Sequence, residues 1–358
     1  MEILVLNTNY EPVDIVDNFK SMIWTDRYNS NGDFEMHLTI TPKTFDRLKE
    51  DYYLWTKESE HCMIIENLSI DSDAEDGNYL IVTGRSLESI LERRIVWGQR
   101  VLKGNLQLAI QTLLNESIIS PTITDRKIDN FIFEPSTDPK ITSLTVDTQF
   151  TGDDLFVVIK NLCQANDLGF KIALNDQNQF VFSLYAGLDR SYSQVENSYV
   201  IFSPGFENII NSNYFTSKAG LKNVTLVAGE GEGTSRKMAV VGTGSGLHRR
   251  EIFTDARDIS SEVDGGTLTP AEYTAQLQAR GNEKLSEHTY ITAFEGEVEA
   301  THLFKYGEDF FIGDIVQVAN EYGHEGRAYI SELIISQSED GVSMYPTFQT
   351  IQEEGDET

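Results

Sequence analysis

The fold class is decided by residues 19–38, which read FKSMIWTDRYNSNGDFEMHL. Apolar and polar residues alternate on both sides of the Asn31-Gly32 step, as they do in strands that bury one face. Asn and Gly both tolerate a positive φ, so this step predicts a tight turn between two antiparallel strands.

The neighbouring segments continue this β pattern. Residues 3–6 predict a short apolar strand, and residues 62–70 and 79–83 predict a second hairpin around the polar residues 71–78. Several short antiparallel strands with turn signals between them indicate a small barrel or sandwich.

The pattern then changes to a helical period. Ser86 predicts the N-cap of a helix that ends near Gly98, Asn105 opens a second helix, and residues 151–154 start a third. Asp167-Leu168-Gly169 is expected to end the third helix with a left-handed glycine. The apolar faces are Leu87, Ile90, Leu91 and Ile95; Leu106, Ala109, Ile110, Leu113 and Leu114; and Leu155, Val158, Ile159 and Leu162. With strands expected at 170–174 and 179–185, roughly residues 100–205 predict a small α/β unit.

The last third returns to strands, with one long helix. Residues 223–228 and 236–241 predict two strands that flank the glycine-rich stretch 229–233. Thr269-Pro270-Ala271-Glu272 is a capping box with proline at the first helical position, and Tyr273, Leu277 and Leu285 supply the buried side of its helix. An antiparallel meander is expected at 289–294, 310–319, 327–336 and 342–349, connected by the loop 322–326 and the Asp340-Gly341 turn.

Charge and composition exclude several classes of function. The 358 residues contain 57 Asp and Glu against 28 Lys and Arg, a formal net charge of -29, so sequence-specific nucleic-acid binding is not expected. Apolar runs stay shorter than the ~18 residues of a spanning helix, and the first residues lack the features of a signal peptide. Cys62 and Cys163 stand apart and are interpreted as reduced core thiols.

Metal-site patterns are weak. The sequence has no HExxH motif, and we expect no metal ligands among the histidines, which are His37, His61, His248, His288, His302 and His324. The cluster Asp71, Asp73, Glu75 and Gly77 resembles a calcium loop but fails its spacing, so a solvated hairpin tip is predicted and weak adventitious Ca²⁺ binding stays open.

Catalytic and cofactor patterns are weak as well. The stretches 229–233 and 242–246 are not phosphate-binding loops and are interpreted as flexible hairpin tips, and Ser245 lacks a nucleophile elbow. A pair of catalytic carboxylates cannot be selected among 57 acids. We therefore expect no catalytic residues and no cofactor.

Arginines are better indicators of specific contacts than acidic residues, because they are scarce in this chain. Arg93-Arg94 lies at the end of a predicted helix, where positive charge complements the helix dipole. Arg249-Arg250-Glu251 and Asp255-Ala256-Arg257-Asp258 interleave opposite charges. Two interpretations stay open: local ion pairs that tie elements together, or pairs at a subunit seam.

Three segments, taken in order with the 19–38 hairpin, resemble one known family. They are residues 84–95 (GRSLESILERRI); Gly229-Glu230-Gly231 followed by residues 246–259 (GLHRREIFTDARDI); and residues 277–285 (LQARGNEKL) with residues 306–316 (YGEDFFIGDIV). Together they resemble the ReqiPepy-type siphovirus tail proteins, similar to the N-terminal part of tail-associated hub proteins, over about residues 1–350. The structural signature that the resemblance points to is Arg93, Arg94, Arg249, Arg250, Glu251, Asp255, Arg257, Asp258, Tyr306, Gly313 and Asp314.

The resemblance implies a baseplate hub at the tip of a phage or prophage tail, assembled in the host cytoplasm and used in host attachment and DNA ejection. Proteins similar to this are homotrimers whose two β-barrels per subunit build a pseudo-sixfold ring. The implied fold class is α+β, mainly β, with two small antiparallel β-barrels and an α/β insertion. The expected domains are 1–98, an N-terminal β-barrel; 99–210, α/β; 211–350, a second β-barrel with the long helix; and 351–358, an acidic tail.

The implied partners are two further copies of the chain, the distal tail protein, other tail-tip or receptor-binding proteins, and the tape measure protein. The resembling part carries no catalytic residues, so any lytic activity is expected from another polypeptide. A negative ring lining would let DNA slide through, because like charges repel.

Two other functions stay open on the sequence. One is a tail-borne cell-wall hydrolase with unidentified carboxylates. The other is a carbohydrate-binding adhesin that uses Trp24, Tyr28, Trp55 or Trp97 as stacking platforms.

Overall fold

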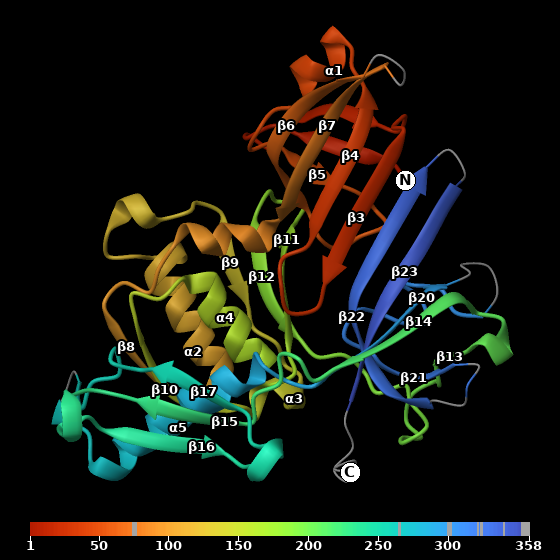
Figure 1. Ribbon diagram of the computed structural model, residues 1–358. Coiled ribbons are helices and arrows are strands. Elements are labelled where there is room, and N and C mark those ends of the chain that lie inside the picture. Colours follow the sequence, from red (N-terminus) through yellow and green to blue (C-terminus); the bar gives the residue numbers. More distant parts are fainter. Residues whose placement is uncertain are drawn as a thin grey trace.

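The computed structural model describes residues 1–73, 77–263, 266–298, 303–320, 322, 325–338 and 341–351. Figure 1 shows a large sheet on one side of the molecule and a helical unit with smaller sheets on the other. Glu75, Asp340, His302, His324, the middle of the 322–326 loop and nearly all of the 351–358 tail lie outside the described residues.

The large sheet has thirteen strands and combines both ends of the chain. Its N-terminal strands are β1 Ile3–Leu6, β2 Pro12–Val16, β3 Ser21–Arg27, β4 Asp33–Thr39, β5 Tyr53–Trp55, β6 Met63–Asp73 and β7 Gly77–Ser86, with the short helix α1 Pro42–Arg47 between β4 and β5. Its other strands are β13 Ile201–Phe202, β14 Ile209–Ser217, β20 Ile291–Val298, β21 Ile315–Ala319, β22 Glu325–Ser338 and β23 Gly341–Thr350. The two sets meet where β22 pairs antiparallel with β3, from Glu332 opposite Arg27 to Ser338 opposite Ser21.

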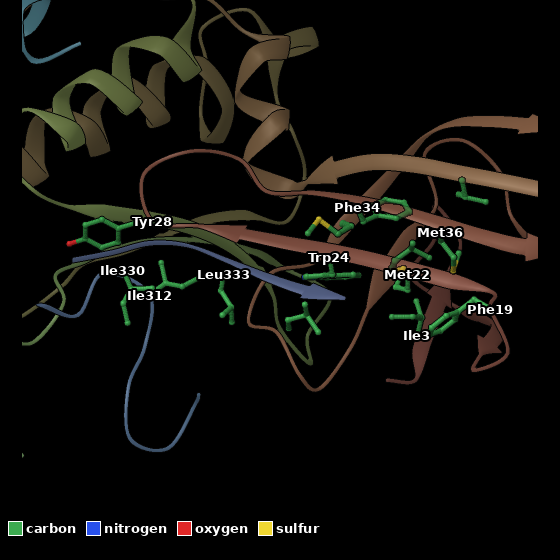
Figure 2. Packing of buried hydrophobic residues seen from close by; sticks show 14 of the residues in the cluster. Ile3, Phe19, Met22, Trp24, Tyr28, Phe34, Met36, Ile312, Ile330 and Leu333 are labelled. Atoms are coloured by element: carbon green, nitrogen blue, oxygen red, sulfur yellow. The ribbon is translucent and has the colours of Figure 1, made fainter. Parts of the chain in front are cut away.

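The two strands of the deciding hairpin pair as predicted, but the tight Asn31-Gly32 turn does not form. The pairing closes with Thr25 opposite Asp33, so residues 26–32 connect the strands, and neither Asn31 nor Gly32 has a positive φ. β3 and β4 pair antiparallel, with Trp24 opposite Phe34 and Met22 opposite Met36. These four side chains are at most 3% exposed, and Figure 2 shows them clustered near Ile3 and Phe19. Each such side chain contributes about 1.5–3 kcal/mol through the apolar surface that it buries. The second predicted hairpin is also confirmed, because β6 pairs with β7.

The middle of the chain folds as an α/β unit. Its helices are α2 Leu106–Leu114, α3 Pro139–Thr142 and α4 Leu155–Gln164, and its strands are β8 Gln99–Asn105, β9 Phe131–Glu134, β10 Thr145–Thr151, β11 Gly169–Leu174 and β12 Phe180–Tyr185. The other helical segments are the 3₁₀ segments η1 Leu87–Arg93 and η3 Thr124–Arg126 and the π-helical segment η2 Asn115–Ile119. The predicted helix starts at Asn105 and at residues 151–154 are confirmed. The side chains of Asn105 and Asp154 each accept a hydrogen bond from a backbone N–H of the helix that follows.

Two details of this unit differ from the prediction. Ser86 stays paired in β7, and its hydroxyl accepts from the N–H of Gly32 instead of capping a helix, so η1 is a 3₁₀ segment that ends at Arg93 and leaves Ile95 41% exposed. The left-handed residue after α4 is Asp167, with φ 52°, rather than Gly169. Gly169 is needed for space, because a Cβ there would lie 2.5 Å from the rings of Tyr28 and Tyr185.

A small sheet and the long helix form the third part. The sheet orders β16 Met238–Gly242, β15 Val224–Ala228 and β17 Glu251–Asp255, and β18 Glu262–Val263 pairs with β19 Gly266–Thr267. The helix α5 Pro270–Ser286 begins with the predicted capping box of Thr269 and Glu272. Tyr273 and Leu277 pack on Val227, Ala239 and Val241 of the small sheet. Single turns of helix at η4 Pro204–Phe206, η5 Gly233–Ser235 and η6 Gly246–His248 complete the elements.

The end of the chain differs from the expected meander in two respects. β21, β22 and β23 pair consecutively, but β20 pairs with β23 instead of β21. The strand expected from Phe310 begins only at Ile315, because the Asp314 side chain accepts the backbone N–H of Phe311 and turns the chain there.

The architecture is therefore mainly β with an α/β unit, as predicted. The two β-rich regions share one sheet through β3 and β22, and closure into a barrel is not found among the described strands. The two-barrel organisation and the domain boundaries after residues 98, 210 and 350 stay predictions.

Candidate functional site

A cluster of buried ionisable side chains joins the large sheet to the α/β unit. Nδ1 of His61 lies 3.0 Å from Oε1 of Glu88, and these side chains are 4% and 0% exposed. Oε1 of Glu88 also accepts from the backbone N–H of Ile172 in β11, at 2.7 Å. Beside them, Asp26 of β3 accepts from Nε1 of Trp24 at 2.9 Å and from the hydroxyl of Ser59 at 2.7 Å. The cluster thus ties β3, η1 and β11 through polar bonds in the interior.

Electrostatics in this cluster favour a charged pair. Burial by itself lowers the pKa of His61, but the negative charges of Glu88 and Asp26 outweigh it and raise that pKa to about 9. Burial raises the pKa of Glu88, yet the positive charge and hydrogen bond of His61 bring it below its usual value. The pKa of Asp26 is raised by burial. At neutral pH the cluster therefore holds an imidazolium beside a carboxylate.

A second junction lies at the end of β3, around Tyr28. The Tyr28 ring is 4% exposed, its hydroxyl donates to the carbonyl of Asp167 at 2.8 Å, and its backbone N–H donates to the carbonyl of Ser331 at 3.0 Å. Gly313 has φ 91°, and a Cβ there would lie 2.2 Å from the Tyr28 ring. Figure 2 shows Tyr28 beside Ile312 and Ile330. One aromatic side chain thus connects the α/β unit with both sets of large-sheet strands.

Asp314 completes this junction. Its carboxylate pairs with Nε of Arg190 at 2.7 Å and accepts the N–H of Leu188 at 2.7 Å, and its side chain is 3% exposed. Nearby, Arg327 of β22 pairs with Asp189 at 2.8 Å. These contacts fasten the segment after β12 to β21 and β22.

A shallow pocket opens between the two junctions. Its charged lining residues are Glu60, His61, Lys171, Arg190 and Asp314. Each already has a partner: Lys171 pairs with Glu60, His61 with Glu88, and Arg190 with Asp314. The pocket therefore presents satisfied charges and serves as part of the junction.

The remaining signature residues gather on the small sheet. Arg249 pairs with Glu251 at 2.5 Å. Asp255 pairs with Arg257 at 2.6 Å and with Arg236 at 2.7 Å. The guanidinium of Arg250 donates to the carbonyl of Lys218 at 2.7 Å. These side chains lie along β17 and its ends.

Asp258 belongs to a different contact. It accepts from Arg280 of α5 at 2.9 Å, and the same guanidinium donates to the carbonyl of Gln149 in β10 at 2.7 Å. The amides of Gln149 and Gln276 also bond across this interface. Asp258 thus helps to attach the small sheet and α5 to the α/β unit.

The structure places the eleven signature residues in separate groups. Arg93 and Arg94 lie at the end of η1, where Arg93 faces Asp51 at 3.4 Å and Arg94 donates to the carbonyl of Arg126 at 2.9 Å. Tyr306, Gly313 and Asp314 lie around the second junction, and the others lie on or beside the small sheet. Local ion pairs are therefore formed within one chain, and a seam between subunits stays a proposal.

Sequence reasoning missed the His61–Glu88 pair. Glu88 stands three residues before Leu91 and seven before Ile95, on the apolar face of the predicted helix. A lone carboxylate in that position was the available signal, because burial there requires a partner.

Sequence reasoning also treated Gly229 as part of a flexible tip. Its backbone is packed against α5, where the Tyr273 hydroxyl accepts the N–H of Glu230 at 2.8 Å.

The four aromatic candidates for sugar stacking have different environments. Trp24 and Tyr28 are buried in the core and present no face to a ligand. Trp55 is 41% exposed, and Trp97 is 57% exposed with the Arg126 guanidinium 5.1 Å from its ring.

The cysteines and the possible metal ligands form the last group of candidates. Cys62 and Cys163 are free and buried, and burial raises the pKa of both thiols, as expected for reduced core residues. Among the residues that the structure describes, no group of three or more His, Cys, Asp or Glu side chains is placed to hold a metal ion. Within the same part of the chain, no helix combines the length and apolar character needed to cross a membrane.

Comparison with known families identifies the chain. The family described as Siphovirus ReqiPepy6 Gp37-like protein matches residues 2–348. The chain belongs to this family of siphovirus tail proteins, which confirms the resemblance found in the sequence. No curated protein matches the chain.

Solved structures of tail proteins share the fold. The 43 kDa tail protein of prophage MuSo2 from Shewanella oneidensis is 12% identical, with a TM-score of 0.58 over 97% of this chain and 98% of that one. A tail protein from Neisseria meningitidis MC58 is 12% identical, with a TM-score of 0.57 over 99% and 97%. The prophage tail protein gp18 from Listeria monocytogenes EGD-e is 13% identical, with a TM-score of 0.54 over 99% and 95%. The likeness covers almost the whole of each chain and concerns the fold.

Proposed function

From membership of this family of siphovirus tail proteins, we propose that the chain is a baseplate hub at the tip of a phage or prophage tail. The observation that carries the proposal is the family match over residues 2–348. The fold supports it, because three tail proteins share it over 97–99% of this chain. The role is structural: the chain acts through its shape and its contacts, and catalyses no reaction.

In this proposal three copies close into a ring. A ring with rotational symmetry brings one surface of each copy against a different surface of the next, and this closure gives an assembly of fixed size. The ring adapts the sixfold distal tail ring on one side to the threefold tip on the other. Its further neighbours are the tape measure protein and the receptor-binding or other tail-tip proteins.

The positions of three arginine–carboxylate ion pairs support a structural role. Three arginines lie where segments of the fold meet, each with at most 26% of its side chain exposed and each paired with a carboxylate. They are Arg190 and Arg327 at the second junction and Arg280 between α5 and the α/β unit. These pairs connect segments that are 22 to 138 positions apart. A ring component must keep the relative positions of its segments, and these partly buried pairs hold them.

The acidity of the chain has a use in such a ring. With a net charge of -29, a lumen lined by carboxylates repels the DNA backbone, so that the genome passes without binding. The proposal requires that acidic side chains face the lumen, and a neutral or basic lumen in the assembled tip contradicts this part of it.

Two measurements test the proposal. Native mass spectrometry of the full chain is expected to give three times the 40.4 kDa chain mass, alone or with neighbouring tail proteins. Electron microscopy of the intact tail is expected to show three copies around the axis at its tip. A monomer under both conditions, or a position away from the tip, overturns the proposal. A zymogram on host cell wall is expected to show no lysis by the purified chain.

A further inference from the structure

The small sheet has one covered face and one bare face. α5 covers the first through Tyr273 and Leu277. The second, here called the outer face, consists of Leu226, Met238, Val240 and Phe253, which are 39%, 52%, 60% and 55% exposed. In the strand register Leu226 lies directly opposite Val240 on one side and Phe253 on the other. Three of these side chains therefore form a continuous row across all three strands.

The pattern of β16 is unusual for a strand with one face in water. Such strands alternate apolar residues toward the core with polar residues toward solvent. β16 instead reads Met238-Ala239-Val240-Val241, apolar on both faces. Strands with this pattern are covered on both sides.

The edge of the outer face is richer in positive charge than the rest of the chain. Arg236, Arg249 and Arg257 share two carboxylates, because Asp255 pairs with two of these guanidiniums and Glu251 with the third. Residues 236–257 contain five Lys or Arg and two Asp or Glu, a net charge of +3, in a chain of -29. The Arg236 guanidinium lies 5.7 Å from the centre of the Phe253 ring and borders the apolar row directly.

We propose that the outer face of the small sheet is the surface on which a second copy of this chain docks. The inference rests on the proposed ring and assigns one of its two contact surfaces. An apolar centre with arginines at its edge has the composition of protein–protein interfaces. The positive edge fits an acidic surface, and the remainder of this chain supplies one because its net charge is strongly negative. Figure 1 shows the small sheet at the periphery, away from the large sheet, where a neighbour can reach it.

Substitutions at the centre and at the edge test the assignment. Val240→Asp places a charge in the apolar row and is expected to weaken self-association at least about tenfold, so that single-chain mass dominates in native mass spectrometry. Arg257→Glu reverses one edge charge without touching the core and is expected to weaken self-association less, with the difference disappearing at high salt. The matched controls are Val195→Asp, at a side chain 88% exposed on another segment, and Arg93→Glu, at the end of η1. Both controls are expected to keep the wild-type mass.

A cross-linking experiment gives a second, independent result. A photoreactive p-benzoylphenylalanine in place of Phe253 is expected to form a covalent adduct with another copy of the chain upon illumination. Circular dichroism and the thermal midpoint of every variant establish that it folds. Because Val240 and Phe253 are more than half exposed, the monomer fold tolerates both changes.

The outcomes separate this inference from the ring itself. If the wild type and Val240→Asp both give three chains, the outer face is not the contact and the ring stands. If the wild type forms an assembly with a different fixed number of chains and Val240→Asp abolishes that assembly, the outer face is the contact surface but the ring is not threefold. A wild type that stays monomeric overturns both. Cross-linking at position 253 to a different tail protein, with no chain-to-chain adduct, assigns the outer face to that protein and overturns the inference.

Discussion

Two regions of the molecule hold opposite charges together and differ in their access to water. In the interior cluster, His61 and Glu88 are at most 4% exposed and bond to β11. At the edge of the small sheet, the Arg257 and Asp255 side chains are 69% and 41% exposed. A charge buried without its partner is costly, whereas an exposed one is solvated when its partner leaves. The first region therefore maintains the fold, and the second is free to exchange its partners for those of a neighbouring chain.

Among the variants that test this difference, Glu88→Gln is expected to have the largest effect on stability. The substitution keeps the side-chain shape but leaves the His61 charge without a partner in the interior, which costs about 3–5 kcal/mol of the free energy of unfolding. Urea unfolding followed by circular dichroism measures the loss. Glu92→Gln, at the carboxylate that pairs with Arg85 near the surface, is the control and is expected to cost less than about 1 kcal/mol. Equal losses in the two variants contradict the distinction.

The pH dependence of stability gives the next largest effect. The folded pKa of His61, about 9, exceeds its ordinary value of 6.5, so its contribution is complete below pH 6.5 and disappears as the pH rises through 9. That contribution is on the order of 3 kcal/mol. The lowered pKa of Glu88 affects stability at acidic pH. Its contribution to the free energy of unfolding is present above about pH 4.5 and is lost as the pH falls through the folded pKa of Glu88.

Unfolding experiments between pH 4 and pH 10 check this window. The wild type is expected to lose stability from neutral pH toward pH 9.5, and Glu88→Gln is expected to lose less over the same range because its His61 pKa is no longer raised by that carboxylate. A parallel loss in both proteins would place the titrating group elsewhere.

Gly313→Ala tests the second interior junction. The added Cβ meets the Tyr28 ring at 2.2 Å, and the backbone there has φ 91°, which disfavours alanine. A loss of about 1–3 kcal/mol in the free energy of unfolding is expected, because the ring is held on all sides and cannot move without repacking. Gly326→Ala, with nothing within 4 Å of its added Cβ, is the control and is expected to change thermal stability little.

Asp255→Asn gives the smallest effect on the fold. The Arg257 side chain is 69% exposed and remains solvated, and Arg236, which is 19% exposed, keeps its hydrogen bonds to the carbonyls of Ala228 and Gly229. The thermal midpoint is therefore expected to stay at the wild-type value. A drop comparable to that of Glu88→Gln would show that the exposed pairs also maintain the fold, and the contrast between the two regions would fail.

Local patterns predicted the elements well where a few adjacent residues determine the structure. The caps at Asn105 and Asp154 and the capping box at Thr269 depend on neighbours within the same turn. The strands of the 19–38 hairpin were predicted correctly, but its tight Asn31-Gly32 turn was wrong, because residues 26–32 connect the strands. The side-chain cap at Ser86 was wrong because the N–H of Gly32 donates to that hydroxyl, and the segment that follows is a 3₁₀ helix that ends at Arg93 rather than near Gly98. Local preference decides an element only when no distant group claims the same atoms.

Long-range contacts could not be predicted from the same patterns. Glu88 and Ile172 are 84 positions apart, and Arg27 and Glu332 are 305 positions apart. Periodicity identifies a buried face but does not identify the segment that covers it. The scarcity of arginine drew attention to residues 249–258, but only the register of β15, β16 and β17 shows that an apolar row lies beside them.

The pairing of β3 with β22 has a consequence for synthesis. β3 is made within the first 27 residues, and its neighbour ends at residue 338. Until nearly the whole chain has left the ribosome, that edge of the first-made strands has no hydrogen-bonding partner of its own, while the intervening helices can already pack. Contacts so distant along the chain slow folding and expose strand edges to aggregation. The pairing of β3 with β22 is therefore expected to form late in folding, after residues 332–338 have been made.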